Sequence, residues 1–228
     1  MIKEKERDMK NYEVINYQNL KKSESMDKYL IKECLNVANA AHFPTDYDDV
    51  KEHLFGSDNL IKLFIIDREM LTIKGFLAAD YFKGYCDNNI LHCHGIIVHP
   101  DIQSMGYSKM LVNALVKEYQ PDIVTAKTHN PRCFNMFTEI NDVKAYFPNN
   151  FEIPEDIYNL VKTDPYIKVV DHDLVFRDAY PDEKIQQEYR NQELKEIFSK
   201  VGFFDAQAIV VVLNDSKLNI KGKQKIKR

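Results

Sequence analysis

The feature that most constrains the fold is a run in which a strand passes through a short loop into an amphipathic helix. Residues 90–98 are apolar enough for a buried strand, and residues 106–119 repeat apolar side chains at helical spacing until Pro121 stops the helix. Backbone N–H groups at a helix start are unpaired and lie at the positive end of the dipole, a combination that binds phosphate. Gly106 would allow close backbone approach, although the same spacing also fits an ordinary strand–loop–helix with a turn glycine.

The rest of the chain alternates short strands with helices. The predicted strands cover 12–17, 60–66, 71–81, 122–126 and 208–213, and the predicted helices cover 25–40, 44–55, 131–137, 154–162 and 184–200. We expect Ser25 to cap the first helix and a hairpin turn at 83–89. One α/β domain over residues 1–216, with an insertion at about 140–205 before the last strand, explains this order better than two domains. Residues 217–228 read as a flexible tail.

Charge is distributed unevenly along the 228 residues. The net charge is −4, but residues 217–228 hold six basic side chains and no acid, so the body of the protein carries about −10. An acidic body disfavours a nucleic-acid partner, because such binding depends on phosphate neutralisation, and it would attract a cationic substrate. The basic tail is typical of a solvated terminus, with contact to RNA or anionic lipid as the alternative.

Hydropathy and cysteine usage indicate a cytoplasmic protein. The longest aliphatic run, 208–213, is far shorter than the roughly 20 residues of a membrane-spanning helix. No apolar segment follows the charged N-terminal residues, so we expect neither a secretory signal nor membrane insertion. The four cysteines show no Cys-x-x-Cys spacing, which favours a reducing compartment.

Two motifs resemble the GNAT superfamily of acetyl-CoA-dependent N-acyltransferases. The first is Gln103-x-x-Gly106-x-Ser108, which follows Ile-Ile-Val-His-Pro at 96–100 and resembles the pyrophosphate loop of that family. Ser108 departs from the usual Gly or Ala but remains small. The second is Asn130, at the start of the 131–137 helix, which matches an Asn that often meets the pantetheine arm. The resemblance covers residues 10–140 and the last strand.

This resemblance implies a mixed, mostly antiparallel central sheet flanked by helices, and acetyl-CoA as co-substrate. In the family, pantetheine inserts between the strand of Val98 and the strand of Val124, and an N–H near Val98 polarises the thioester carbonyl. An acceptor amine then attacks directly. The implied cofactor-binding residues are Ile96, Ile97, Val98, Gln103, Ser104, Met105, Gly106, Tyr107, Ser108, Asn130 and Phe137.

A general base is needed because a protonated amine cannot attack. Some family members use a Glu six residues before the position of Val98, and here that residue is His92. Imidazole titrates near pH 6.5 and suits the role. His94 lies on the same strand face and is the second candidate. Both could instead be ordinary hydrogen-bonded strand residues.

The residue expected to protonate the departing thiolate is missing. The family often has a Tyr seven residues after the Asn, and this chain has Phe137 there. Cys133 or Tyr146 could replace it, or the thiolate could leave unaided.

A metal site is not predicted. Strand alternation sets Cys93 opposite His92 and His94, and zinc needs three or four converging ligands. The acidic run at 46–52 is either a rim for an ammonium substrate or a solvated helix start.

Three functions remain in competition. The sequence favours an N-acetyltransferase that moves an acetyl group from acetyl-CoA to a primary amine on a small molecule or peptide. The alternative is a non-catalytic acyl-CoA-binding regulatory module of the same fold. A third is an RNA-associated acetyltransferase docked by the tail. A homodimer is left open.

Overall fold

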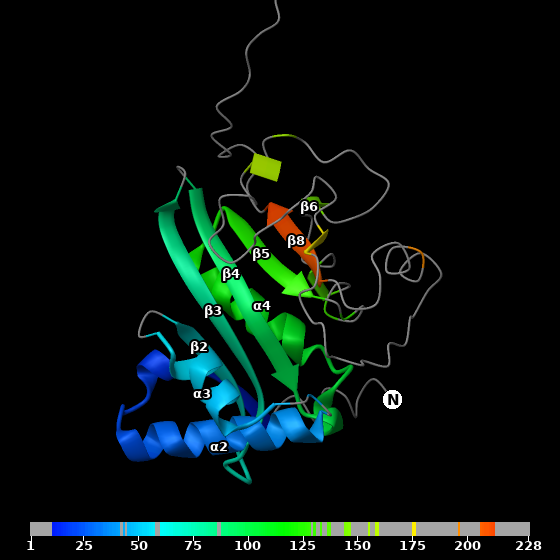
Figure 1. Cartoon of the computed structure of the whole chain (residues 1–228). Coiled ribbons are helices and arrows are strands. Elements are labelled where there is room, and N and C mark those ends of the chain that lie inside the picture. Colours follow the sequence, from blue (N-terminus) through cyan, green and yellow to red (C-terminus); the bar gives the residue numbers. More distant parts are fainter. Residues whose placement is uncertain are drawn as a thin grey trace, which may run out of the picture. The chain divides into compact units, whose positions relative to one another are not determined.

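A computed structural model describes most of the first 130 residues and parts of the rest. The described residues are 11–41, 43, 45–57, 60–85, 88–128, 130, 133, 136–137, 144–146, 155, 158–159, 175–176, 196 and 206–212. Contacts divide the chain into two units, Met1–Tyr81 with Cys93–Gln120 and Phe82–His92 with Pro121–Arg228. Each unit holds part of β3 (Ile73–Tyr85) and part of β4 (Asn88–Val98), the two long strands in Figure 1.

In the first unit, four strands follow the order β1-β2-β3-β4. Strand β1 (Tyr12–Asn16) pairs antiparallel with β2 (Ile61–Asp67), and β2 pairs antiparallel with β3. The β2–β3 register, in which Lys62 faces Ala78 and Phe64 faces Phe76, assigns each side chain to one face of the sheet. The register shifts between Ile65 and Ile66.

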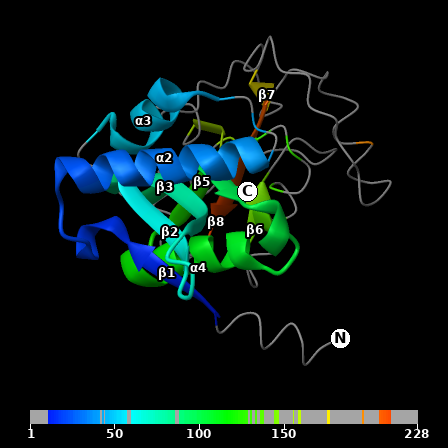
Figure 2. The same cartoon turned by 90° about the horizontal axis from the view of Figure 1, so that it is seen from below.

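Helices cover both faces of this unit's sheet (Figure 2). Helices α2 (Glu24–Ala40) and α3 (Tyr47–Phe55) bury Leu30, Cys34 and Leu54 in a core cluster with Phe64, Phe76 and Ala78. Helix α4 (Tyr107–Tyr119) buries Leu111 and Leu115 on the other side. Short 3-10 helices, η2 (Tyr17–Asn19) and η3 (Pro100–Ile102), connect the elements.

Local capping explains where the first two helices begin. The Ser23 side chain accepts a hydrogen bond from the Met26 N–H, so α2 begins at Glu24 and Ser23, not the expected Ser25, is its cap. Helix α3 begins after Asp46, whose carboxylate accepts from the N–H groups of Asp48 and Asp49. The Asp49 carboxylate in turn accepts a hydrogen bond from the Asp46 N–H, which completes a capping box.

The second unit is built around an antiparallel pair. Strand β5 (Ile123–Thr128) pairs with β8 (Ala206–Val212), the predicted last strand. Two short strands that the sequence analysis did not predict, β6 (Lys144–Tyr146) and β7 (Val175–Phe176), also pair antiparallel with β8. Both belong to the predicted insertion, so parts of that insertion extend this unit's sheet.

Other predictions for this region fall mostly outside the described residues. Within the predicted helix at 154–162, Glu155, Tyr158 and Asn159 are helical, and within that at 184–200 only Glu196 is described and is helical. The tail at 217–228 lies outside the described residues. The expected architecture is confirmed as an α/β fold with a mostly antiparallel sheet flanked by helices. None of the helices described is long and apolar enough to cross a membrane.

Candidate functional site

The loop that follows β4 is held in place by hydrogen bonds to its neighbours. The His99 N–H donates to the Lys74 carbonyl at 2.8 Å, which fixes the strand end against β3. The buried Ile102 anchors the short helix η3. The side-chain amide of Gln103 donates to the Val98 carbonyl at 2.9 Å and closes the loop on itself. Gln103 therefore holds the loop in shape through Val98, the strand residue that the family resemblance places next to the thioester.

Helix α4 begins in a conformation that favours glycine. Gly106 is its N-cap with φ 88° and ψ 4°, and Ser104 is also left-handed with φ 64°. No side chain caps this helix within the described part of the chain, and the first intrahelical bond runs from the Met110 N–H to the Gly106 carbonyl. A Cβ placed on Gly106 would meet no atom within 4 Å.

This arrangement fits the phosphate groups of a nucleotide cofactor. Ser104 and Gly106 are exposed, whereas Tyr107 behind them is buried. Open space therefore lies above backbone N–H groups at the positive end of a helix of 13 residues. Met105 and Ser108 are half-buried beside it. Of the six predicted loop residues, Gln103 to Gly106 form the turn, and Tyr107 and Ser108 begin helix α4.

Strand β4 changes character along its length. Residues 90–93 are buried, but His94, Ile96 and Ile97 are half-exposed and Gly95 is exposed, before Val98 is buried again. Beneath the strand, a Cβ on Gly75 would lie 3.1 Å from the Ile97 carbonyl oxygen, so β3 approaches this backbone closely. The half of β4 next to the loop is therefore both fixed by β3 and accessible.

His94 lies in that accessible half and contacts a carboxylate. Its Nε2 is 2.9 Å from Oδ2 of Asp80 on β3. The His94 side chain is 19% exposed and that of Asp80 is 9% exposed. Sequence reasoning missed Asp80, although it is an acid at the end of a strand predicted to be apolar.

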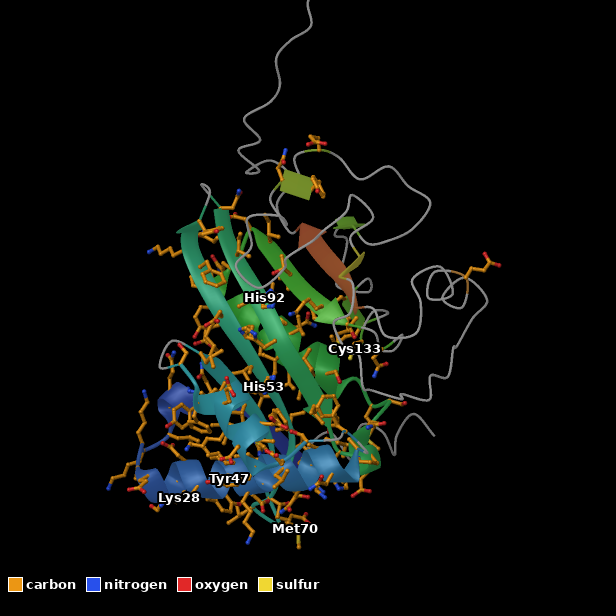
Figure 3. All side chains as sticks on the ribbon, viewed as in Figure 1. Lys28, Tyr47, His53, Met70, His92 and Cys133 are labelled. Atoms are coloured by element: carbon orange, nitrogen blue, oxygen red, sulfur yellow. The ribbon has the colours of Figure 1, made fainter. Side chains whose placement is uncertain are left out.

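His92 has different surroundings, and they belong to the second unit. It lies on β4 (Figure 3) and is 0% exposed. Its Nδ1 is 2.9 Å from the Thr125 hydroxyl on β5. Thr125 is itself buried and was not singled out by the sequence. The ring of His92 is thus fixed by a neutral partner.

The other predicted residues of the second unit follow β5. Asn130 is half-buried, and its backbone N–H donates to the Thr128 hydroxyl at 3.0 Å. Phe137 is buried and helical, and Cys133 is helical as well. Burial raises the pKa of the Cys133 thiol to about 11, against a smaller lowering by a hydrogen bond to Thr128. Tyr146 lies on β6, and its side chain falls outside the described residues.

The acidic run at 46–52 and His99 have structural explanations. Asp46 and Asp49 are used in the capping box of α3, which favours the helix-start interpretation of the acidic run. His99 is held by Asp101, whose N–H donates to Nδ1 at 3.3 Å. Among the described residues, no group of three or more His, Cys, Asp or Glu is placed to hold a metal ion.

Comparisons with known proteins agree with this geometry. Residues 28–138 match the model of the Acetyltransferase (GNAT) family. No curated protein matches the sequence. Many solved structures are similar. One is a chain of the NatC complex bound to Gag peptide and CoA, with 11% identity, a TM-score of 0.50, and coverage of 89% of this chain and 99% of that one.

Two further structures have slightly lower TM-scores. The ribosomal-protein-S18-alanine N-acetyltransferase from Escherichia coli is 12% identical with a TM-score of 0.49, over 89% of this chain and 94% of that one. NAA60 from Arabidopsis thaliana, in complex with a bisubstrate analogue, is 10% identical with a TM-score of 0.47, over 89% and 100%. At such identities the likeness concerns the fold alone. Residues 28–138, which include the loop at Gly106 and the accessible half of β4, therefore belong to the acetyltransferase (GNAT) family.

Proposed function

We propose that this protein is an N-acetyltransferase that moves an acetyl group from acetyl-CoA to a primary amine. The observation that carries the proposal is the left-handed Gly106. It opens a helix that no described side chain caps, next to the accessible half of a strand. Anions are stabilised at such a helix start, and the pyrophosphate of coenzyme A carries the charge that it favours. Family membership of residues 28–138 supports the reaction class.

The loop residues have separate roles in this proposal. Backbone N–H groups at 104–108 would hold the pyrophosphate, and Gln103 would keep the loop in shape through its bond to Val98. Ile96 and Ile97 are half-exposed residues, and an extended ligand arm would pair with the backbone there. Asn130 and Phe137 stay candidates for contact with pantetheine. The acetyl group arrives as a thioester, which an uncharged amine can attack directly.

The general base is proposed to be an imidazole of β4. His92 occupies the position that the resemblance assigns to this role. His94 is the better placed of the two to exchange a proton with a bound amine, since its side chain is 19% exposed and that of His92 is buried. A general base must come within hydrogen-bond reach of the proton that it removes. We therefore propose His94 as the base and His92 as the alternative.

A charged acceptor is consistent with the surroundings. The body of the chain carries about −10, which attracts ammonium groups over long range. Both small amines and peptide amines carry that charge near neutral pH. The proposed acceptor class is thus defined by its charge and by one nucleophilic nitrogen.

Acetyl transfer can be measured directly. The full chain is incubated with acetyl-CoA and a panel of diamines, aminoglycosides and short peptides, and coenzyme A and acetylated products are quantified by chromatography and mass spectrometry. We expect release of coenzyme A that depends on the amine. Tight binding of acetyl-CoA without amine-dependent release would instead favour the regulatory binding module.

A further inference from the structure

The pair formed by Asp80 and His94 lies where the core of the first unit becomes polar. Ala78 belongs to the core cluster under α2 and α3, and Asp80 follows it on the same face of β3 by strand alternation. Both partners are mostly buried, and Nε2 is 2.9 Å from Oδ2. A mostly buried carboxylate needs hydrogen-bond partners, and an imidazole N–H supplies one.

The contact determines which nitrogen of the ring is basic. A carboxylate only accepts hydrogen bonds, so Nε2 must carry the hydrogen that it donates to Oδ2 of Asp80. Nδ1 then holds the lone pair of the neutral imidazole. The carboxylate also stabilises the imidazolium that forms when Nδ1 takes up a proton. The Asp80 carboxylate on β3 thus fixes the orientation of the His94 ring and also stabilises its protonated form.

We propose that Asp80 is a positioning residue for the acetyl transfer, and that it sets His94 as the general base with Nδ1 as the proton-accepting atom. This inference rests on the proposed function. An ammonium acceptor loses two protons overall, and His94 accepts one of them at Nδ1 and passes it to solvent. The nitrogen forms a bond to the thioester carbon, the C–S bond breaks with its electron pair on sulfur, and the second proton ends on the thiol of coenzyme A.

Other titratable groups, Lys62 and Cys34 among them, share this face of the core. Lys62 on β2 pairs with Ala78 and so lies diagonally from Asp80. Its Nζ is 4.7 Å from the ring centroids of both Tyr17 and Phe55. The Cys34 thiol of α2 also belongs to this cluster, and burial raises its pKa well above the usual range, so it stays neutral. On β4, His92 lies two residues before His94. The positive charge of Lys62 would oppose protonation of His94, whereas the Asp80 carboxylate favours it.

The test compares Asp80→Asn with wild type in the full chain. Asn keeps the size and an oxygen acceptor but removes the charge. We expect kcat/KM for the amine to fall about 10-fold, because a charge-assisted hydrogen bond becomes a neutral one of roughly half its strength. The acidic limb of the kcat/KM–pH profile should move to lower pH by about one unit, because the imidazolium loses its carboxylate. Affinity for coenzyme A should stay within twofold.

Asp27→Asn is the matched control. It also removes a carboxylate on this face of the unit, one that accepts a hydrogen bond from the Tyr17 hydroxyl at 2.6 Å, without touching His94. It should leave the position of the acidic limb unchanged. His94→Ala should abolish the limb, whereas His92→Ala should leave it in place. A limb that vanishes in His92→Ala, or an unchanged profile in Asp80→Asn, overturns the proposal.

A second readout is independent of turnover. In the NMR spectrum of protein with 13C-labelled histidine, the titration midpoint of His94 should fall in Asp80→Asn and not in Asp27→Asn. An unchanged midpoint overturns the pairing even in an active enzyme. If wild type acetylates no amine, the proposed function fails and the role of His94 with it, while the NMR shift still reports the pair. The two failures are therefore distinguishable.

Discussion

Substitutions of Gly106 should affect the free energy of unfolding and the affinity for coenzyme A in different orders. The residue has φ 88°, and a Cβ there would meet no protein atom within 4 Å. The cost to the fold is therefore conformational. For Ala it should be about 1–2 kcal/mol, the usual penalty for an L-residue in the left-handed region. Asn should cost less because it visits this region more readily, and Val should cost more because it is β-branched.

Affinity for coenzyme A should follow a different order. Every replacement adds a Cβ to the open space in front of the helix start, so all three should hinder close approach of a phosphate. Loss of one charge-assisted hydrogen bond is worth about 1.5–3 kcal/mol, which corresponds to about a 10- to 100-fold weaker Kd. Asn should thus restore stability without restoring affinity.

The assay combines calorimetric titration with coenzyme A at fixed ionic strength and urea unfolding of the same variants. Gly84→Ala is the matched control, because Gly84 also has a positive φ, 66°, and open space where a Cβ would lie. It should lose stability and keep affinity. Wild-type affinity in Gly106→Val, or an equal loss in Gly84→Ala, would show that the phosphate site is not at this loop.

Three further predictions concern stability. In Gly75→Ala the new Cβ would lie 2.8 Å from Cδ1 of Ile65 and 3.1 Å from the Ile97 carbonyl oxygen, so unfolding in urea should show a loss of about 1–3 kcal/mol; a loss below about 0.5 would contradict the close approach of β3 and β4. Asp46→Ala should cost about 1 kcal/mol in the same assay through the capping box, whereas Asp48→Ala, which lacks that role, should cost clearly less. Burial raises the pKa of Cys93 from about 9 to about 12, so the folded state keeps the proton that the unfolded state loses, and the free energy of unfolding should fall as pH rises above 9. That slope should be shallower in Cys93→Ala by about 1.4 kcal/mol per pH unit, and equal slopes would refute the burial of the thiol.

Local patterns predicted the elements of the first unit well. The helix at 106–119 and the strand at 90–98 were found within two residues of their observed bounds, because periodicity and Pro121 are local signals. Ser25 was wrong as a cap because Ser23 and Ser25 are chemically alike, and the choice depends on which hydroxyl reaches the Met26 N–H. Which of the two serines caps the helix depends on the local backbone conformation, and the residue types alone do not determine that conformation.

Short strands of the insertion escaped prediction for another reason. Strands β6 and β7 have three and two residues, too few to show an alternating pattern. They exist through pairing with β8, and β7 is 30 residues or more from that strand in the sequence. A strand whose main support is a distant partner leaves almost no signal in its own residues.

The two histidines of β4 show the same limit at the candidate site. Alternation makes them equivalent, since residues two apart share a face. The structure distinguishes them by cross-strand partners 33 and 14 positions away, a hydroxyl for His92 and a carboxylate for His94. A neutral partner orients a ring, but a carboxylate also stabilises its protonated form, and only a ring with exposed surface can meet an incoming amine. The family resemblance therefore limits the candidate base to His92 or His94. The choice between them depends on the charge of the partner residue and on the exposure of the ring.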